Sequence, residues 1–310
     1  MKQGNICRLI IYSVLLGFIL LPALGNALDF SLEPRFQAGI MDYKFEQKSV
    51  TTINDAGESS TDHGFKLISD LPFVGSGATL FANRFFIDFY AQKAFSGSDS
   101  ATNSVNHSAF ENTQFNIINR SDFDREEYSV SLGYAVGSQW AVFGGYRTSK
   151  TNFTNILTQS DDFITSTENG DFPSKFTARG KRNIDFKQDG YFLGGAYALN
   201  IGEHTVITLN TALAFLNGRY DSRGDIDMKI VTDINGTPVT TERNFKLGFD
   251  HNGDTVGLNL GAAWKGRISD YLSYTLGVNG YSYDFDAKEK GVSDLSETVL
   301  RLSAGLAYRF

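Results

Sequence analysis

The chain has 310 residues, a formal net charge of -7 and a single cysteine. This acidic balance argues against nucleic acid as a partner, because nucleic-acid binding needs a basic surface. With 26 Phe, 14 Tyr and 31 Gly but only 5 Pro, the composition suits one large β domain and excludes a Pro-rich or disulfide-stapled chain.

The N-terminus has the pattern of a secretory signal peptide. Lys2 and Arg8 give it a positive start, and an almost unbroken apolar run follows at residues 9–21. We expect residues 1–27 to be cleaved and residues 28–310 to form a single barrel domain. A membrane anchor is the alternative, but the run is shorter than the ~20 residues that a spanning helix needs. Cleavage would remove two positive charges, so -7 becomes -9, and would remove the only cysteine.

Six later segments alternate apolar residues with small or polar ones, which predicts strands that have one apolar face. In chain order they are residues 85–89, 128–136, 191–199, 207–215, 256–264 and 272–278. Short polar breaks join the strands in pairs at residues 82–84, 137–139, 200–204 and 266–270. Four short turns imply five long hairpins. The sequence therefore predicts ten antiparallel strands, with twelve as the alternative.

The two central hairpins are long, and both carry Asn-Gly at their midpoints. These pairs are Asn169-Gly170 and Asn235-Gly236. Asn-Gly is the strongest signal for a two-residue hairpin turn, because both turn positions need a positive φ. Arms of about 30 residues would rise roughly 75 Å, against an apolar band about 25 Å tall. We therefore expect these hairpins to project far beyond a membrane.

The phase of the alternation inverts along several of these arms. Ile184 and Phe186 fall on the face opposite to that of the apolar residues nearer the short turn, and Tyr281, Tyr283 and Phe285 do the same on a later arm. Outside a bilayer the outer face meets water, so apolar side chains belong in the interior. The inversion predicts a closed barrel that continues above the lipid with an apolar inner layer. Floppy loops with mutually packed aromatics are the alternative.

The last strand carries the most specific signal. Its apolar face ends in aromatic residues, and Ser303, Gly305, Tyr308 and Phe310 match a pattern of polar, glycine, aromatic and terminal aromatic residues. This pattern resembles the C-terminal assembly signal of bacterial outer-membrane β-barrel proteins. An edge strand of a soluble sheet is the alternative. The resemblance implies an all-β, closed antiparallel transmembrane barrel in the outer membrane of a Gram-negative bacterium. Its expected partners are outer-membrane lipid, lipopolysaccharide and, during insertion, the barrel-assembly machinery.

Signals for catalysis are weak. The predicted tall barrel of ten strands is similar in architecture to the omptins, a family of outer-membrane proteases. Their chemistry needs an Asp-x-Asp pair facing an Asp-x-His pair. This chain has Asp225-x-Asp227, but His63 and His251 directly follow aspartates, and adjacent strand residues point to opposite faces. We find no catalytic, metal or cofactor site, and read the acidic run at residues 250–254 as a solvated loop.

Five charged residues fall on predicted inward faces: Arg35, Asp88, Arg147, Arg301 and Arg309. They would set ion preference in a channel, or pair with one another in a filled barrel. Ten strands leave at best a narrow passage. The leading expectation is a narrow channel or a binding barrel for a small solute, with an apolar solute as one option. A surface structural or adhesion protein that acts through its long loops is the alternative, and an outer-membrane hydrolase is disfavoured.

Overall fold

The computed structural model describes residues 30–47, 50–53, 59–62, 66–95, 98–106, 114–167, 170–288 and 294–310. The predicted signal peptide and Asn169 lie outside these residues. No helix in the described ranges is long and apolar enough to span a membrane. The strands are β1 (Phe30–Gln47), β2 (Val50–Ile53), β3 (Ser59–Asp62), β4 (Lys66–Ala82), β5 (Phe85–Ala94), β6 (Ser98–Asn106), β7 (Gln114–Val136), β8 (Trp140–Thr167), β9 (Gly170–Ile201), β10 (Thr205–Ile234), β11 (Thr237–Arg267), β12 (Leu272–Ala287) and β13 (Leu295–Tyr308).

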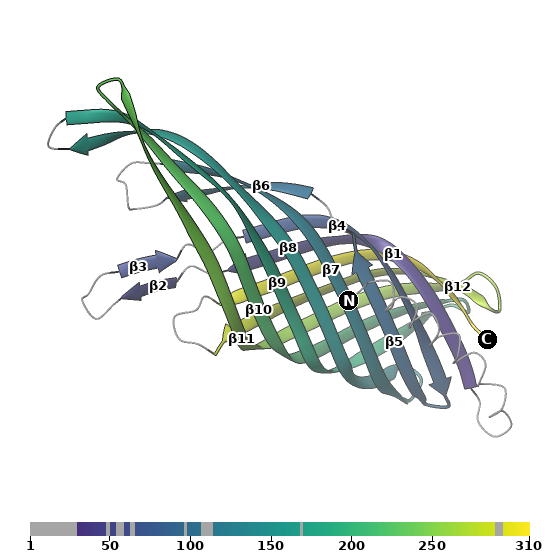
Figure 1. The fold of residues 1–310 in the computed structure, drawn as a ribbon. Helices are drawn as coiled ribbons and strands as arrows, with labels where there is room; N and C mark the ends of the chain where they lie inside the picture. Colours follow the sequence, from purple (N-terminus) through teal and green to yellow (C-terminus); the bar gives the residue numbers. More distant parts are fainter. Residues whose placement is uncertain are drawn as a thin grey trace, which may run out of the picture.

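The described strands form a closed antiparallel ring (Figure 1). The ring runs in the order β1, β4, β5, β7, β8, β9, β10, β11, β12 and β13, and the pairings of β5 with β7 and of β1 with β13 close it. β6 adds to β7 beyond the ring, and β2 pairs only with β3 among the described strands. The prediction of ten strands is therefore confirmed, and the alternative of twelve is not.

The connections divide into a turn end and a hairpin end. Short turns at residues 83–84, 137–139, 202–204 and 268–271 link the strands at one end of the ring. The long hairpins lie at the other end. β1 begins and β13 finishes at the turn end, where the Phe310 amide donates a hydrogen bond of 3.0 Å to the Leu32 carbonyl and the Arg309 amide one of 2.7 Å to the Tyr271 carbonyl. The start of β1 and the end of β13 thus lie on the same side of the barrel.

The observed register of one central hairpin agrees with the register predicted from the sequence, and that of the other differs from it. Asn235 and Gly236 connect Ile234 to Thr237 and have φ values of 54° and 82°, as a two-residue turn of this type requires. In the preceding hairpin, however, Gly170 is paired with Thr167. Gly170 is therefore a strand residue rather than the second residue of the predicted Asn169-Gly170 turn, and Asn169 itself lies outside the described residues.

The Asn235-Gly236 turn offers a local test of this register. Replacing Gly236 by alanine will strain a residue that needs positive φ, by about 1–3 kcal/mol. We expect faster amide hydrogen exchange at the neighbouring strand ends, with little change in global stability. Gly248→Ala on β11, the strand that follows the turn, is the matched control, since a Cβ there meets no atom within 4 Å. Equal exchange in the two variants would contradict this assignment.

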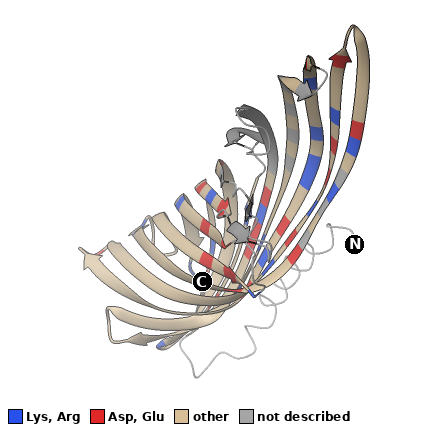
Figure 2. Cartoon of the chain, turned by 90° about the vertical axis from the view of Figure 1, so that its left-hand side faces the viewer, with Lys and Arg blue, Asp and Glu red and all other residues tan. Residues whose placement is uncertain are grey.

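Near the turn end, the outer surface is a continuous apolar belt. Its large side chains are exposed on every strand of the ring, as in Ile40, Leu132 and Leu260. Beyond the belt the outward residues become charged while the inward ones become apolar. Ile184, Phe186, Tyr281, Tyr283 and Phe285 are all buried. Figure 2 shows the same division. The lower strands are largely free of charged residues, whereas the long strands carry them.

One side of the barrel is much taller than the other. β8, β9, β10 and β11 have 28, 32, 30 and 31 residues, whereas β12 and β13 have 16 and 14. We call the part of β8–β11 beyond the belt the wall; it extends to the upper left in Figure 1. Among the described residues, positions 237–251 of β11 pair with β10 alone. The wall is therefore an open sheet with an edge strand, above a closed ring.

Candidate functional site: the barrel interior

Inward-facing side chains divide the interior into three successive levels. The order is visible along β12, where Asn279 lines a polar cavity, Tyr281 contacts a cluster of buried charges, and Phe285 packs in an aromatic layer. The polar cavity lies nearest the turn end, and the aromatic layer lies nearest the wall.

Aromatic rings from six strands meet in the aromatic layer. Phe45 has its ring centroid 5.5 Å from that of Phe153, 5.4 Å from that of Phe186 and 6.3 Å from that of Tyr220. Stacked and edge-to-face pairs at these distances are favourable beyond their buried area. All members of the layer are at most 3% exposed: Tyr43, Phe45, Phe123, Phe153, Phe186, Tyr220 and Phe285. The rings belong to one hydrophobic cluster inside the barrel, which also contains Leu71, Phe73, Leu216 and Leu295.

Beneath the aromatic layer lies a group of five buried charged residues, the charged cluster: Arg125, Glu127, Arg147, Glu297 and Arg301. Arg125 on β7 forms an ion pair with Glu297 on β13, a strand that is not its neighbour in the ring. Glu127 is shared by three guanidinium groups. Its carboxylate oxygens lie 2.9 Å from Arg147 Nη2, 3.5 Å from Arg301 Nη1 and 3.9 Å from Arg125 Nη2.

Tyrosines surround these guanidinium groups. The Cζ atom of Arg147 lies 4.4 Å from the ring centroid of Tyr281 and 4.9 Å from that of Tyr283. Arg125 donates a hydrogen bond of 2.7 Å to the Tyr281 hydroxyl. Cation–π contacts of this kind are strongest where water is excluded. Gly257 makes room for the Tyr283 ring, because a Cβ there would approach the ring to 1.8 Å.

The surroundings of Arg125 and of the nearby Tyr43 determine the protonation states of these two side chains. Arg125 on β7 lies between the outward-facing Asp124 and Glu126. Tyr43 on β1 lies likewise between Asp42 and Lys44, so both residues lie beyond the apolar belt. Burial, with help from the Glu297 carboxylate, raises the pKa of the Tyr43 hydroxyl well above its usual value. Burial alone would lower the pKa of Arg125, but Glu297 and its neighbours raise it instead. Tyr43 is therefore neutral and Arg125 charged at physiological pH.

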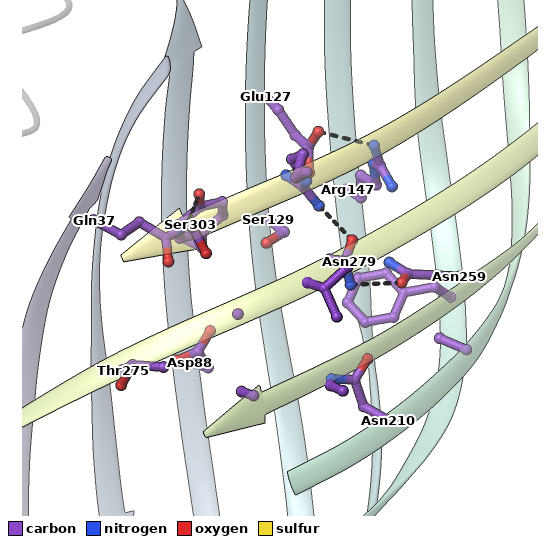
Figure 3. Close-up of a pocket in the computed structure, with 18 of the residues that line it drawn as sticks. Gln37, Asp88, Glu127, Ser129, Arg147, Asn210, Asn259, Thr275, Asn279 and Ser303 are labelled. Atoms are coloured by element: carbon purple, nitrogen blue, oxygen red, sulfur yellow. Dashed lines mark hydrogen bonds and ion pairs between the residues drawn. The ribbon is translucent and has the colours of Figure 1, made fainter. Parts of the chain in front are cut away.

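The polar cavity has a volume of about 370 Å³ and is walled by side chains from most of the ring (Figure 3). Arg35 and Asp88 form a bidentate ion pair in its wall, with N–O distances of 2.6 and 2.9 Å. On another wall, Asn279 donates a hydrogen bond of 2.8 Å to Asn259. Arg147 and Arg301 of the charged cluster reach the cavity from the hairpin side. The cavity wall is thus mixed, because these polar groups stand beside apolar side chains such as Phe143, Phe192 and Ala262.

An ion pair also crosses the interior near the turn end. Lys265 on β11 and Glu33 on β1 face each other, although β12 and β13 separate these strands in the ring. The pair is partly exposed, with side-chain exposures of 38% and 16%. The cavity therefore lies between this pair and the charged cluster.

Four of the five predicted lumen charges line this interior: Arg35, Asp88, Arg147 and Arg301. Arg309 does not, because it follows the end of β13 and is exposed. Sequence reasoning missed Arg125, Glu127 and Glu297. A signal for two of them was present, because residues an even number apart on a strand point to the same face. Glu127 therefore shares the inward face of Ser129, and Glu297 shares that of Arg301.

The acidic and histidine side chains that suggested hydrolytic chemistry do not meet. Asp225 and Asp227 are exposed on the outward face of β10. His251 lies on the other face of the neighbouring β11, opposite Tyr220, and His63 is outside the described residues. No group of three or more His, Cys, Asp or Glu in the described part of the chain could hold a metal ion.

Comparison with known proteins supports the fold. No family model and no curated protein matches the chain. Among solved structures, the outer-membrane protease OmpT from Escherichia coli is similar with a TM-score of 0.54 and 12% identity, over 92% of this chain and 99% of that one. The toluene transporter TodX of Pseudomonas putida (TM-score 0.32, 8% identity, 91% and 90% covered) and Ail of Yersinia pestis (0.29, 11%, 90% and 99%) are more distant. The chain has the fold of a bacterial outer-membrane β-barrel.

Proposed function

We propose that this protein resides in the outer membrane of a Gram-negative bacterium and binds a partner at the cell surface through its wall. In this arrangement the apolar belt meets lipid, the turn end faces the periplasm and the hairpin end faces outward. Residues 1–27 would direct its export. The observation that carries the proposal is the combination of an interior interrupted by the aromatic layer with four strands that continue far past the ring.

The interrupted interior favours surface binding over conduction. An open channel needs a continuous polar path, but the aromatic layer interrupts the polar interior with rings that are at most 3% exposed. Opening such a path would separate packed aromatic rings, at about 3–5 kcal/mol for each ring lost. Inward side chains in small barrels commonly fill the lumen in this way.

The outer face of the wall is suited to recognition in water. It carries paired charges, such as Arg219 with Asp250 at 2.6 Å and Lys229 with Glu242 at 3.0 Å. The Arg219 guanidinium holds the pKa of the Asp250 carboxyl below its usual value. The edge strand β11 also carries Lys246, and charged edges of this kind oppose strand addition. We therefore expect side chains on the face, rather than backbone on the edge, to contact the partner.

A shortened wall provides the test. Met228 pairs with Arg243, so removing residues 229–234 and 237–242 while keeping Asn235-Gly236 leaves the register unchanged. We expect cells that display this variant to attach to host-cell or matrix-coated surfaces at least tenfold less than cells that display the natural protein. The barrel should assemble normally, since the shortened segment lies beyond the ring.

Two measurements complete this test. Surface labelling should report equal amounts of the two proteins, and the intact protein should give no conductance steps in planar bilayers. Unchanged attachment by the shortened variant would contradict the proposal. Reproducible conductance steps would instead support the narrow channel.

A further inference from the structure

We infer that the polar cavity is a binding site for a small anion, such as a short carboxylate or phosphate, held between Arg147 and Arg301. This inference is independent of the proposed surface function, because it concerns the interior near the turn end and not the wall. It rests on a charge imbalance, on unpaired donors and on an available volume.

The charge imbalance is a count over the described inward residues. Between the Glu33–Lys265 pair and the aromatic layer, arginines outnumber carboxylates by four to three. The arginines are Arg35, Arg125, Arg147 and Arg301, and the carboxylates are Asp88, Glu127 and Glu297. An uncompensated charge inside a barrel is costly unless a counter-charge or water approaches it.

The excess positive charge is located at the cavity. Asp88 neutralises Arg35 and Glu297 neutralises Arg125 through direct ion pairs. Arg147 and Arg301 are left to share Glu127. Both of these arginines line the cavity and are at most 8% exposed.

Unpaired donors next to the cavity strengthen the case. The Nε atom of Arg147, which lines the cavity, is buried without a hydrogen-bond acceptor, as is the Nε2 atom of Gln92, which lies outside the lining. The Gln92 Oε1 atom accepts a hydrogen bond of 2.7 Å from Arg301, so the two side chains are joined. Asn210 and Asn279 add amide groups in the cavity wall (Figure 3). Guanidinium groups with neighbouring amide donors suit carboxylates and phosphates.

The cavity size limits the ligand. A volume of about 370 Å³ admits a small organic anion but excludes a lipid or a peptide. Entry would come from the turn end, where the side chains of the Lys265–Glu33 pair are only partly buried. The ligand is therefore a soluble solute. One negative charge on it would compensate the excess of one arginine over the carboxylates.

A charge-compensation variant tests the site. Ser129 pairs directly with Arg147 across the strands β7 and β8 and shares its inward face. Ser129→Asp places the missing negative charge beside Arg147, and Ser129→Asn is the matched neutral control. Acetate and inorganic phosphate are titrated calorimetrically into the folded barrel, in zwitterionic detergent and chloride-free buffer.

We expect saturable binding of one anion to the natural protein. Ser129→Asp should weaken it at least tenfold, whereas Ser129→Asn should stay within about twofold. If Ser129→Asp fails to fold, the isosteric Asn279→Asp supplies the same charge beside Arg301, which donates a hydrogen bond of 2.8 Å to the Asn279 side chain. The shortened wall variant should bind normally, which separates this inference from the surface function. Absence of saturable binding by the natural protein, or equal binding by a folded aspartate variant, overturns it.

Discussion

Replacing Glu297 by glutamine will lower the free energy of unfolding by about 3–5 kcal/mol, because it leaves Arg125 buried without its ion-pair partner. Both side chains are 1% exposed. The expected loss is a large fraction of the stability of an ordinary folded domain. Denaturant titration of the refolded barrel, followed by the change in electrophoretic mobility on unfolding, measures it.

The matched control is Glu242→Gln, which breaks an exposed ion pair with Lys229 on the wall. Exposed pairs contribute about 0–1 kcal/mol, so this variant should unfold almost as the natural protein does. A second check replaces both partners, Glu297→Leu with Arg125→Met, and should recover part of the loss, since neither position then carries a charge. Equal stability of Glu297→Gln and Glu242→Gln would show that the buried pair contributes little.

Truncating Phe186 to alanine will cost about 3–5 kcal/mol, because the aromatic layer is left with a cavity. The Phe186 ring contacts Phe45 and Tyr220 at centroid distances of 5.4 and 6.5 Å, and meets Phe285 edge-on at 5.7 Å. These neighbours come from three other strands, so the layer cannot collapse around the missing ring without moving the barrel wall. Denaturant unfolding again measures the effect.

The control for this prediction is the next residue on the same strand. Lys187 points outward and is exposed, so Lys187→Ala should change stability by no more than about 0.5 kcal/mol. Single-channel recording adds an independent readout, since a weakened aromatic layer should admit transient current through Phe186→Ala alone. A loss no larger than that of Lys187→Ala would mean that the layer does not hold the barrel together.

Most of the fold could be predicted from local patterns. Strand parity indicated which side chains face outward, and the four short turns gave the number of strands. The Asn235-Gly236 turn also followed from register, because the arms of that hairpin pair directly from Thr205 with Gly266. These features depend on residues close in sequence or on a period of two, so a single chain displays them.

The register of the preceding hairpin shows where such reasoning stops. Trp140 pairs with Tyr197 rather than Leu199. Both Tyr197 and Leu199 have the outward parity, so a slip of two residues keeps every side chain on its proper face. The alternation therefore cannot distinguish the two registers, and only the packing of the whole sheet does.

The sequence by itself determined the class of the protein: a ten-stranded outer-membrane type of barrel with an apolar belt, long hairpins and an inverted pattern beyond the belt. Only the tertiary structure decided how the interior is occupied. Arg125 and Glu297 are 172 residues apart, and they meet because ring closure brings β7 and β13 to face each other across the lumen. Parity places both side chains inside, but the contact between them depends on the diameter and stagger of the closed ring, which no local pattern encodes.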